Sequence, residues 1–375
     1  MLRVAVMGRS IRPRPSGVGR HAANLVSGLA DILPARSLNV FLTQDAPRMA
    51  NQKVREIRAP FPTPNEYARA FWEQTIVPVQ TAALGVDVYH SPNYILPATL
   101  SRPSVVTIHD LTFLQAALHR HTSHLYLSAL TDLALRRARA IIAVSAWTRD
   151  SIVSRYPEVA DRIEVIYQGL DPSFRCPSPD ELGRFRVRLG RLAPYVLFVG
   201  TLEPRKNVAR LIAAFERAVE AAGLPHHLVL IGARGWKTEE IDRAIALSPV
   251  RQRIHQIGYV AEEELPLWYA AADVFVYPSL LEGFGLPPLE AMASGTPVIT
   301  SNCSALPEVV GDAAITVSPA DTSALSAAMV RVLTDPLFAD ALRQAGLRRA
   351  QLFTWSEAAR RHVALYERIT SGGPR

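Results

Sequence analysis

Short apolar runs alternate with helical patterns through the first half of the chain. The runs are bounded by glycine, proline or polar residues, as buried strands are, and amphipathic stretches separate them. The expected strands are Arg3–Met7, Leu38–Thr43, Val86–His90, Ser104–His109, Ala140–Ser145 and Ile163–Tyr167, and the helices between them include Gly19–Leu33 and Ser123–Arg139. This alternation predicts an α/β domain built on a doubly wound sheet.

A second alternation starts at Tyr195. Its expected strands are Tyr195–Gly200, His227–Ile231, Arg253–Ile257, Asp273–Tyr277, Thr296–Ser301 and Ala314–Val317, and its helices are Val208–Ala222, Thr238–Leu247, Glu262–Ala271 and Thr322–Thr334. The proline-rich stretch Asp171–Pro194, around a short helix at Asp180–Leu189, is the predicted linker. The sequence therefore predicts two doubly wound domains, without a sequence repeat between them.

We place the two domains at residues 1–175 and 190–354. Ligands of such sheets bind at the carboxyl ends of the strands. Two facing domains would therefore form an interdomain cleft that holds a donor against an acceptor. A final helix, Ser356–Ile369, has one apolar face and could pack on either domain.

The segment after the expected strand at Asp273–Tyr277 combines glycines with two carboxylates. Glu282 lies on the predicted loop, and Glu290 falls in the first turn of a helix that Pro287 and Pro288 suit. Unpaired N–H groups at a helix start favour an anion, and ionised carboxylates accept hydrogen bonds from sugar hydroxyls. This pattern indicates a sugar-phosphate or nucleotide-sugar site. Alternatively, Glu290 only complements the helix dipole and Glu282 is solvated.

A second candidate segment, from Gly200 to Asn207, follows a strand and opens a helix. It places Arg205 and Lys206 at a helix N-terminus, where the dipole disfavours cations unless an anion is bound. A diphosphate would resolve this conflict, because Arg provides a planar fork and Lys a point charge. A solvated charge pair on a turn is the alternative.

The segment Gly17-Val18-Gly19-Arg20-His21-Ala22 formally matches the dinucleotide fingerprint, and Asp45 follows the second strand. An NAD-dependent dehydrogenase is therefore a rival interpretation. Against it, Gly17 lies about ten residues beyond the first strand, whereas the fingerprint requires a tight turn directly after the strand.

Several histidines are candidates for chemistry. His109 ends a strand and is expected to point toward the cleft, with His90 as the second candidate. His119, His121 and His124 resemble a metal cluster but have no thiolate or strand nearby, so we do not assign them a metal. The segment Glu66–Trp72 mixes aromatic and basic residues, and we interpret it as a core-facing helix rather than a lipid contact.

Composition limits the class of protein. The chain has 375 residues, of which 49% are hydrophobic and 20% charged, so it is globular, and no apolar run is long enough for a membrane helix. The two cysteines exclude a disulfide framework and fit a reducing cytosol. We therefore expect a cytoplasmic protein.

The net charge of +7 is unevenly distributed. Residues 1–176 contain 20 basic and 13 acidic residues, whereas residues 177–375 contain 21 of each. The excess suggests that the first half meets something anionic, such as a membrane surface, a lipid diphosphate or a nucleic acid, although an arginine-rich proteome would produce the same bias.

Together these segments resemble the retaining glycosyltransferases of family 4, also called glycosyltransferase group 1. The resemblance is carried by the Glu282-x7-Glu290 segment and by the residues from Gly200 to Asn207. It is supported by His109-Asp110, Ala143–Ser145 and Val165–Asp171. The resemblance implies a GT-B fold, two facing Rossmann-like domains with an interdomain cleft. It also implies that a C-terminal helix, at 356–370, packs back on the N-terminal domain.

The resemblance also implies roles for individual residues. Glu290 would bind the ribose and Glu282 the transferred sugar, while Arg205 and Lys206 hold the donor diphosphate. Residues expected to contact the donor through backbone or loop positions are Gly17, Gly19, Gly200, Tyr259, Val260, Gly283, Phe284, Gly285 and Leu286. His109 would lie beside the anomeric carbon as a positioning group. Many family members have Arg where Thr201 stands, so the division of work between Arg205 and Lys206 is open.

The expected reaction is hexosyl transfer without a metal or other cofactor. Mannose from GDP-mannose is the favoured donor and a lipid-linked glycan of a bacterial surface polysaccharide, such as a lipopolysaccharide, the favoured acceptor. The N-terminal domain would bind the acceptor and the C-terminal domain the donor, with peripheral contact at the inner face of the membrane and no nucleic-acid partner. The alternatives are a UDP-sugar-dependent transferase of the same fold, the dehydrogenase, and a non-catalytic nucleotide-sugar binder.

Overall fold

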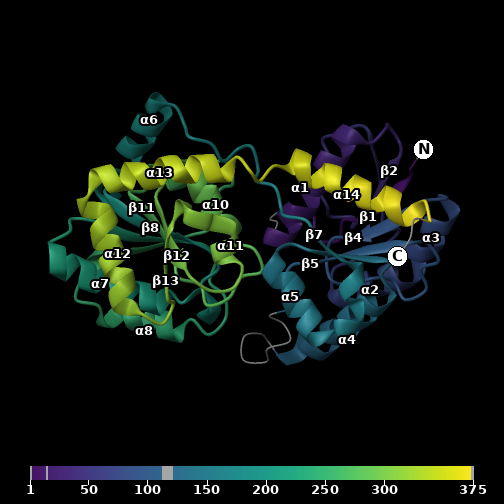
Figure 1. Ribbon diagram of the computed structural model, residues 1–375, viewed down its shortest axis with the longest axis horizontal. Coiled ribbons are helices and arrows are strands. Elements are labelled where there is room, and N and C mark those ends of the chain that lie inside the picture. Colours follow the sequence, from purple (N-terminus) through teal and green to yellow (C-terminus); the bar gives the residue numbers. More distant parts are fainter. Residues whose placement is uncertain (1, 14–15, 112–120, 373–375) are drawn as a thin grey trace. The chain divides into compact units, whose positions relative to one another are not determined.

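The structure is a computed structural model that describes residues 2–13, 16–111 and 121–372. Its contacts divide the chain into two compact units. The first comprises Met1–Gly169 and Phe353–Arg375, and the second comprises Leu170–Leu352. In both units, parallel strands form a sheet and helices cover its two faces (Figure 1). The predicted α/β class with two doubly wound sheets is confirmed.

The first unit is built on a seven-stranded parallel sheet in the order β3-β2-β1-β4-β5-β6-β7. Its strands are β1 (Val4–Met7), β2 (Leu38–Leu42), β3 (Val54–Arg58), β4 (Val88–Ser91), β5 (Ser104–Ile108), β6 (Ala140–Ala143) and β7 (Ile163–Val165). Its helices are α1 (Gly17–Ile32), α2 (Glu66–Phe71), α3 (Val77–Ala83), α4 (His121–Arg137), α5 (Ala146–Arg155) and α14 (Trp355–Thr370), with a π-helical turn at Trp72–Ile76 and a 3₁₀ turn at Pro157–Arg162. β3 is an edge strand that the sequence pattern did not predict.

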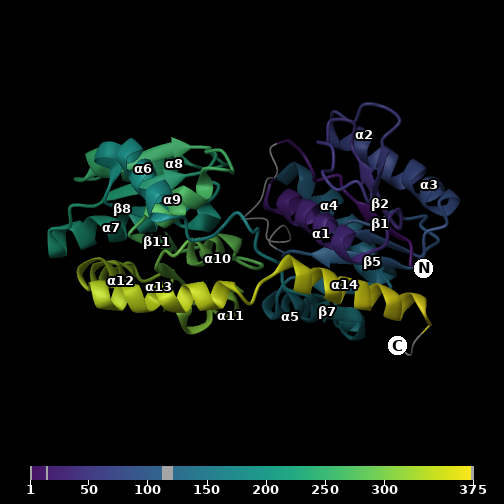
Figure 2. The same cartoon turned by 90° about the horizontal axis from the view of Figure 1, so that it is seen from above.

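The central strands of this sheet are apolar because both of their faces are covered. Val4 and Val6 face a cluster that includes residues of α1 and α14, whereas Ala5 and Met7 face a cluster on the opposite side. Figures 1 and 2 show α14 lying beside α1. The two helices approach closely at Gly28, where a Cβ atom would lie 3.1 Å from the Cβ of Ala359. The last helix therefore belongs to the first unit although it is the last element of the chain.

The second unit is built on a six-stranded parallel sheet in the order β10-β9-β8-β11-β12-β13. Its strands are β8 (Tyr195–Val199), β9 (His227–Ile231), β10 (Ile254–Gly258), β11 (Val274–Tyr277), β12 (Val298–Ser301) and β13 (Ile315–Val317). Its helices are α6 (Pro179–Leu189), α7 (Val208–Ala222), α8 (Glu239–Leu247), α9 (Leu265–Ala271), α10 (Leu286–Ala293), α11 (Leu306–Val310), α12 (Thr322–Thr334) and α13 (Pro336–Ala350), with 3₁₀ turns at Gly190–Leu192, Pro204–Lys206, Arg251–Arg253 and Gly311–Ala313.

The stretch expected to be a linker is part of the second unit. Helix α6 packs against α9, and the rings of Phe185 and Trp268 meet edge to face at 5.3 Å. This apolar contact fixes the helix on the unit, so the boundary between the units falls at Gly169 rather than within residues 176–189. Among the residues that the structure describes, no helix is long and apolar enough to cross a membrane.

Candidate active site

Two loops of the second unit leave the sheet at its topological switch point. Strands β8 and β11 are neighbours in the sheet although about 75 residues separate them in sequence, and the strand order runs in opposite directions on either side of them. Such a switch point opens a crevice at the carboxyl ends of the two strands. The loop after β8 carries Arg205 and Lys206, and the loop after β11 carries Glu282. The sequence-predicted residues of the two segments are thus brought together.

Glu282 is the centre of a buried network of hydrogen bonds and ion pairs. Its Oε1 accepts hydrogen bonds from Lys206 Nζ at 2.5 Å, from Ser279 Oγ at 2.6 Å and from Tyr277 OH at 3.0 Å. Its Oε2 lies 3.0 Å from an Arg205 guanidinium nitrogen. Three donors therefore converge on Oε1 and one lies at Oε2, so two cations and two hydroxyl groups compensate the carboxylate.

The charges in this network determine the protonation of its members. Burial raises the pKa of Glu282, but attraction to Lys206 and Arg205 outweighs burial and lowers the pKa to about 2. Burial lowers the pKa of Lys206, and the neighbouring Glu282 partly offsets this effect. Glu282 is therefore ionised at any pH at which the protein would work.

The position of the two cations differs from the sequence prediction. Arg205 and Lys206 lie in a 3₁₀ turn just before α7, and Asn207, in the left-handed conformation, separates this turn from the helix. Acidic side chains of the protein itself compensate the two cations that the helix dipole would disfavour. Glu282 pairs with both cations, and Glu203 also accepts a hydrogen bond from Arg205 at 2.9 Å. The four side chains together carry no net charge.

Glu290 lies deeper than expected. Helix α10 begins at Leu286, so Glu290 is in its second turn rather than its first, and complementing the helix dipole does not explain the carboxylate. Its side chain is only 3% exposed, and Oε2 accepts a hydrogen bond from Tyr269 OH at 2.8 Å. The sequence placed the helix start too late because it weighted the two prolines rather than the apolar residue before them.

The loop between Glu282 and α10 turns sharply at Gly285. This residue has φ +117°, and a Cβ atom there would lie 2.8 Å from the side chain of Leu306, so only glycine fits. Helix α10 starts without a side-chain cap, and the two prolines after Leu286 have no N–H group. The predicted residues Gly283, Phe284, Gly285 and Leu286 thus form the turn that leads into an uncapped helix.

Two further predicted positions lie at the same edge of this sheet. Gly200 directly follows β8, and the next loop approaches it so closely that a Cβ atom on Gly232 would lie 2.1 Å from the Gly200 carbonyl oxygen. Tyr259 and Val260 follow β10, and the Tyr259 side chain is 58% exposed. An exposed aromatic ring at this edge is able to stack on a planar ligand.

In the first unit, Gly17 and Gly19 do not form a loop. They lie in the first turn of α1, whose N-cap, Ser16, accepts a hydrogen bond from the Gly19 N–H at 3.3 Å. The prediction of a glycine loop was wrong because Ser16 caps the helix ahead of both glycines. The helix start is well removed from the end of β1 at Met7, so the tight strand–helix turn of a dinucleotide site is absent from this part of the described chain.

His109 lies at the end of β5, as predicted, and is buried. Its Nε2 donates to the Pro92 carbonyl oxygen at 2.9 Å, and its ring meets the ring of His21 edge to face at 4.6 Å. Burial lowers the pKa of His109, while the hydrogen bond to Pro92 and the charge of Asp110 raise it. The imidazole is therefore held in a fixed orientation in its neutral form at neutral pH.

His21 was not singled out by the sequence. Its Nδ1 contacts Gln168 Oε1 at 3.0 Å, its ring packs on Trp355 of α14, and its Nε2 makes no hydrogen bond within the described chain. His90, in contrast, is wholly inside the core between Thr107 and Tyr366, so it is not a candidate for the site.

The sequence also missed the aromatic partners of the two carboxylates. Tyr277 is the last residue of β11 and Tyr269 lies in α9, and both hydroxyls bond to a predicted carboxylate. A tyrosine that ends an apolar strand immediately before a proline was the available signal. Of the three histidines that resemble a metal cluster, His119 lies outside the described residues, and so do the side chains of His121 and His124. Within those residues, no group of His, Cys, Asp and Glu is arranged to hold a metal ion.

The fold and these loops define a class: α/β proteins with two doubly wound sheets and charged, glycine-bearing loops at a switch point. Residues 193–335 match the family described as glycosyl transferases group 1, and residues 15–174 match glycosyltransferase family 4. The chain belongs to this family and is a glycosyltransferase. The geometry at Gly17 and the family together exclude the dehydrogenase interpretation.

Known relatives share this assignment. The chain is 35% identical over 285 residues to O-antigen chain mannosyltransferase B of Escherichia coli, an alignment that covers 75% of this chain and 74% of the relative. It is 32% identical over 238 residues to the MMP α-(1→4)-mannosyltransferase of Mycolicibacterium hassiacum, covering 62% of this chain and 55% of that protein.

Solved structures share the fold. Sucrose-phosphate synthase from Thermosynechococcus elongatus superposes with a TM-score of 0.81 at 23% identity, over 100% of both chains. WaaG, a glycosyltransferase involved in lipopolysaccharide biosynthesis, superposes with a TM-score of 0.78 at 17% identity, over 99% of this chain and 100% of the other. These similarities establish that the chain has the GT-B type of fold.

Proposed function

We propose that the protein transfers mannose from GDP-mannose to a lipid-linked glycan during the synthesis of a bacterial surface polysaccharide, with retention of anomeric configuration. The observation that carries this proposal is the similarity to O-antigen chain mannosyltransferase B over three quarters of both chains. Relatives named as mannosyltransferases recur at lower identity, including one from Salmonella typhimurium that also acts on an O-antigen chain.

In the second unit, we assign Arg205 and Lys206 to the donor diphosphate. A bound diphosphate would bring negative charge to a network that is neutral without it, and it would compete with Glu282 for the two cations. Glu282 would then accept hydrogen bonds from hydroxyls of the transferred sugar. This exchange of partners explains why the carboxylate is fully engaged without ligand.

The nucleoside part of the donor is assigned to the remaining edge of the same sheet. Glu290 would accept from the ribose hydroxyls, because a buried carboxylate near the helix start is a strong acceptor. Tyr259 and Val260 would receive the base, with the exposed Tyr259 ring as its support. Gly283, Phe284, Gly285 and Leu286 would approach the phosphates and sugar through their backbone.

The proposed reaction breaks the bond between the anomeric carbon and the oxygen of the donor diphosphate. The acceptor hydroxyl oxygen forms the new bond on the same face, and its proton passes to the departing phosphate oxygen. Negative charge develops on the diphosphate, so preorganised cations stabilise the transition state most effectively there. Arg205 and Lys206 supply that charge in this proposal, without a metal ion.

The first unit is assigned to the acceptor. His109 is fixed by Pro92 and His21, so we assign it to positioning the sugar near the anomeric carbon rather than to covalent catalysis. Gly17 and Gly19 would allow backbone approach to the donor diphosphate from the start of α1. Peripheral contact with an anionic membrane surface is supported by the excess of basic residues in the first half of the chain.

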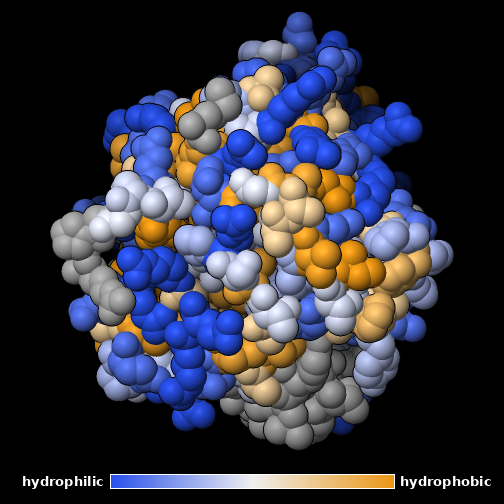
Figure 3. Space-filling view, turned by 90° about the vertical axis from the view of Figure 1, so that its right-hand side faces the viewer, coloured by the Kyte–Doolittle hydropathy of each residue, from blue (hydrophilic) through white to orange (hydrophobic). Residues whose placement is uncertain are grey.

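The exposed side chains of α2 suit a shallow contact between the first unit and a membrane surface. Tyr67 and Phe71, on α2, are 87% and 57% exposed, whereas Trp72 next to them is fully buried, so this segment contributes both to the core and to the surface. On the face seen in Figure 3, hydrophobic side chains form small groups separated by hydrophilic ones. This pattern favours adsorption by charge over deep insertion.

A thermal-shift panel tests the donor assignment. GDP should raise the melting temperature, because a ligand that binds only the folded protein stabilises it by mass action, and UDP should raise it less. NAD serves as the control for a nucleotide that the family does not use. A shift with NAD and none with GDP would contradict the proposed donor.

A further inference from the structure

A cavity lies at the amino ends of strands β5, β6 and β7 in the first sheet. It has a volume of about 1120 Å³, and its walls include the starts of β5, β6 and β7 at Ser104, Ala140 and Ile163. Since His109 marks the carboxyl edge of the same sheet, about one strand length, roughly 15 Å, separates the cavity from that residue. The C-terminal end of α14 closes one side of the cavity with Leu365, Arg368 and Ile369.

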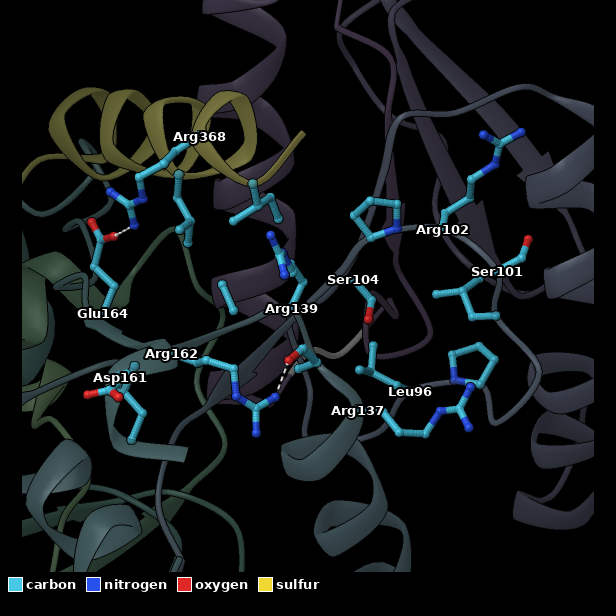
Figure 4. A pocket seen from close by; sticks show the side chains of 18 of the residues that line it. Leu96, Ser101, Arg102, Ser104, Arg137, Arg139, Asp161, Arg162, Glu164 and Arg368 are labelled. Carbon is cyan, nitrogen blue, oxygen red and sulfur yellow. Dashed lines mark hydrogen bonds and ion pairs between the residues drawn. The ribbon is translucent and has the colours of Figure 1, made fainter. Parts of the chain in front are cut away.

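Basic side chains dominate the polar part of this cavity. Arg102, Arg137, Arg139, Arg162 and Arg368 line it, against Glu158, Asp161 and Glu164. Figure 4 shows Arg137, Arg139 and Arg162 arranged around the start of β5, with Arg102 at the far rim.

Most of the acidic groups are already paired. Glu164 forms ion pairs with Arg368 and Arg361, and Glu158 pairs with Arg136, which lies outside the cavity lining. Arg162 donates to the carbonyl oxygens of Arg136 and Ala138, where α4 ends. The guanidinium of Arg162 is therefore engaged with the backbone at the C-terminal end of α4.

Three other arginines of the cavity are not engaged in this way: Arg102, Arg137 and Arg139. Within the residues that the structure describes, none of the three has an acidic or other hydrogen-bonding side-chain partner. The dipole of α4 explains a cation at Arg137, in its last turn, but neither Arg139 nor Arg102 lies in a helix. Among the described residues, Asp161 is the one lining carboxylate outside the ion pairs of Glu158 and Glu164, so these three arginines leave a surplus of positive charge at the cavity, and such a surplus attracts anions.

The remaining walls are apolar. The partly exposed apolar side chains in the lining are those of Leu100, Pro103, Ile163 and Ile369, and Leu96 and Leu365 are buried in the same walls. A cavity with an apolar floor and a cationic rim suits a ligand with an apolar body and an anionic head. Inorganic anions alone would leave this floor exposed to water.

We propose that the cavity lined by Arg137 and Arg139 at the amino edge of β5–β7 binds the phosphate head of a lipid. Two sources share this chemistry: a bulk acidic phospholipid, and an isoprenoid diphosphate such as one that carries a glycan. Either would tether the first unit to a membrane while the carboxyl edge stays free for sugar transfer.

Binding to soluble farnesyl diphosphate and to phosphatidylglycerol vesicles tests this proposal and separates the two sources. The full chain is compared with R137A/R139A and with a matched control, R48A/R55A. The control removes two exposed arginines in or near β3, the outermost strand on the other side of the same sheet from β7. Calorimetric titration measures the farnesyl diphosphate affinity, and co-sedimentation measures vesicle binding. Phosphatidylcholine vesicles correct for adsorption that does not depend on charge.

The cavity variant should bind at least one of the two probes about tenfold or more weakly, because it loses the charge-assisted hydrogen bonds of two arginines. Loss confined to farnesyl diphosphate identifies the isoprenoid diphosphate, and loss confined to vesicles identifies the phospholipid. Equal binding by the cavity variant and the control, for both probes, would overturn the proposal. Sugar transfer to a soluble acceptor should stay unchanged in R137A/R139A, so failure here is distinguishable from failure of the proposed function.

Discussion

At the scale of single residues, Glu282 connects the two loops of the proposed donor site. Its carboxylate pairs with Lys206 and Arg205 from the loop after β8. It also accepts hydrogen bonds from Tyr277, at the end of β11, and from Ser279 just after that strand. Removing one partner of a buried ion pair is more destabilising than the pair is stabilising, since the remaining charge loses its compensation. The sequence predicted Glu282, Arg205 and Lys206 as site residues but missed Tyr277 and Ser279. It also did not predict that these residues satisfy one another without ligand.

Glu282→Ala should therefore impair both stability and transfer. Lys206 would be left buried without its carboxylate, at a cost of about 3–5 kcal/mol in the free energy of unfolding of the second unit. Calorimetric melting should show a clearly lower transition temperature than wild type, and mannosyl transfer should be abolished. Glu263→Ala is the matched control, because this exposed glutamate lies in the same unit and its loss should change stability by less than about 0.5 kcal/mol. An E282A protein that melts like wild type would contradict the buried network.

At the scale of elements, α14 joins a group of buried histidines. His362 donates through Nδ1 to the Ala358 carbonyl oxygen, its ring packs near His90, and Tyr366 contacts His90 Nδ1 at 2.6 Å. Burial lowers the pKa of His362 to about 4, partly offset by its hydrogen bond to Ala358. Burial also lowers the pKa values of His21, His90 and His109. The helix is thus docked against side chains that must stay neutral.

Acid should weaken this docking before it affects the rest of the first unit. The unfolded chain binds protons at His362 below about pH 6.5, whereas the folded chain does so only near pH 4, so stability falls as the pH decreases through this interval. For His362 the loss amounts to about 3 kcal/mol. Melting temperatures measured from pH 7 to pH 4.5 should fall less steeply for His362→Gln than for wild type. Parallel curves would show that His362 does not titrate in this way.

The elements also show what the sequence could and could not predict. Most strands were predicted to within a few residues, because strands covered on both faces leave an apolar run. β3 was missed because Arg55, Glu56 and Arg58 give an edge strand a polar pattern. Helix α13 was missed as well, although Phe338 and Leu342 are spaced for one face.

Side-chain pairing was the least predictable part of the site. His21 and His109 meet from α1 and the end of β5, elements far apart in sequence, and no local pattern indicates that contact. In the sequence, Tyr277 belongs to an apolar strand pattern. Only the structure shows that its hydroxyl donates a hydrogen bond to Glu282. Motifs thus located the loops of the site, whereas the packing of the sheets determined which side chains touch.

At the scale of the whole molecule, the chain is a family 4 glycosyltransferase with two doubly wound units. The carboxyl edge of the second sheet gathers Arg205, Lys206, Glu282 and Glu290, which we assign to the donor. The first sheet carries His109 at its carboxyl edge and the arginine-lined cavity at its amino edge. In our proposal, this separation would let a lipid-linked acceptor be held by its lipid end while its sugar end is modified.

The most direct test is a donor screen with the purified full-length protein and a lipid-linked glycan acceptor. GDP-mannose should yield GDP and a mannosylated product in which NMR shows the α configuration of the donor, while UDP-glucose and UDP-galactose yield no product. Product formed only from a UDP-sugar, or a mannoside with inverted configuration, would contradict the proposed reaction.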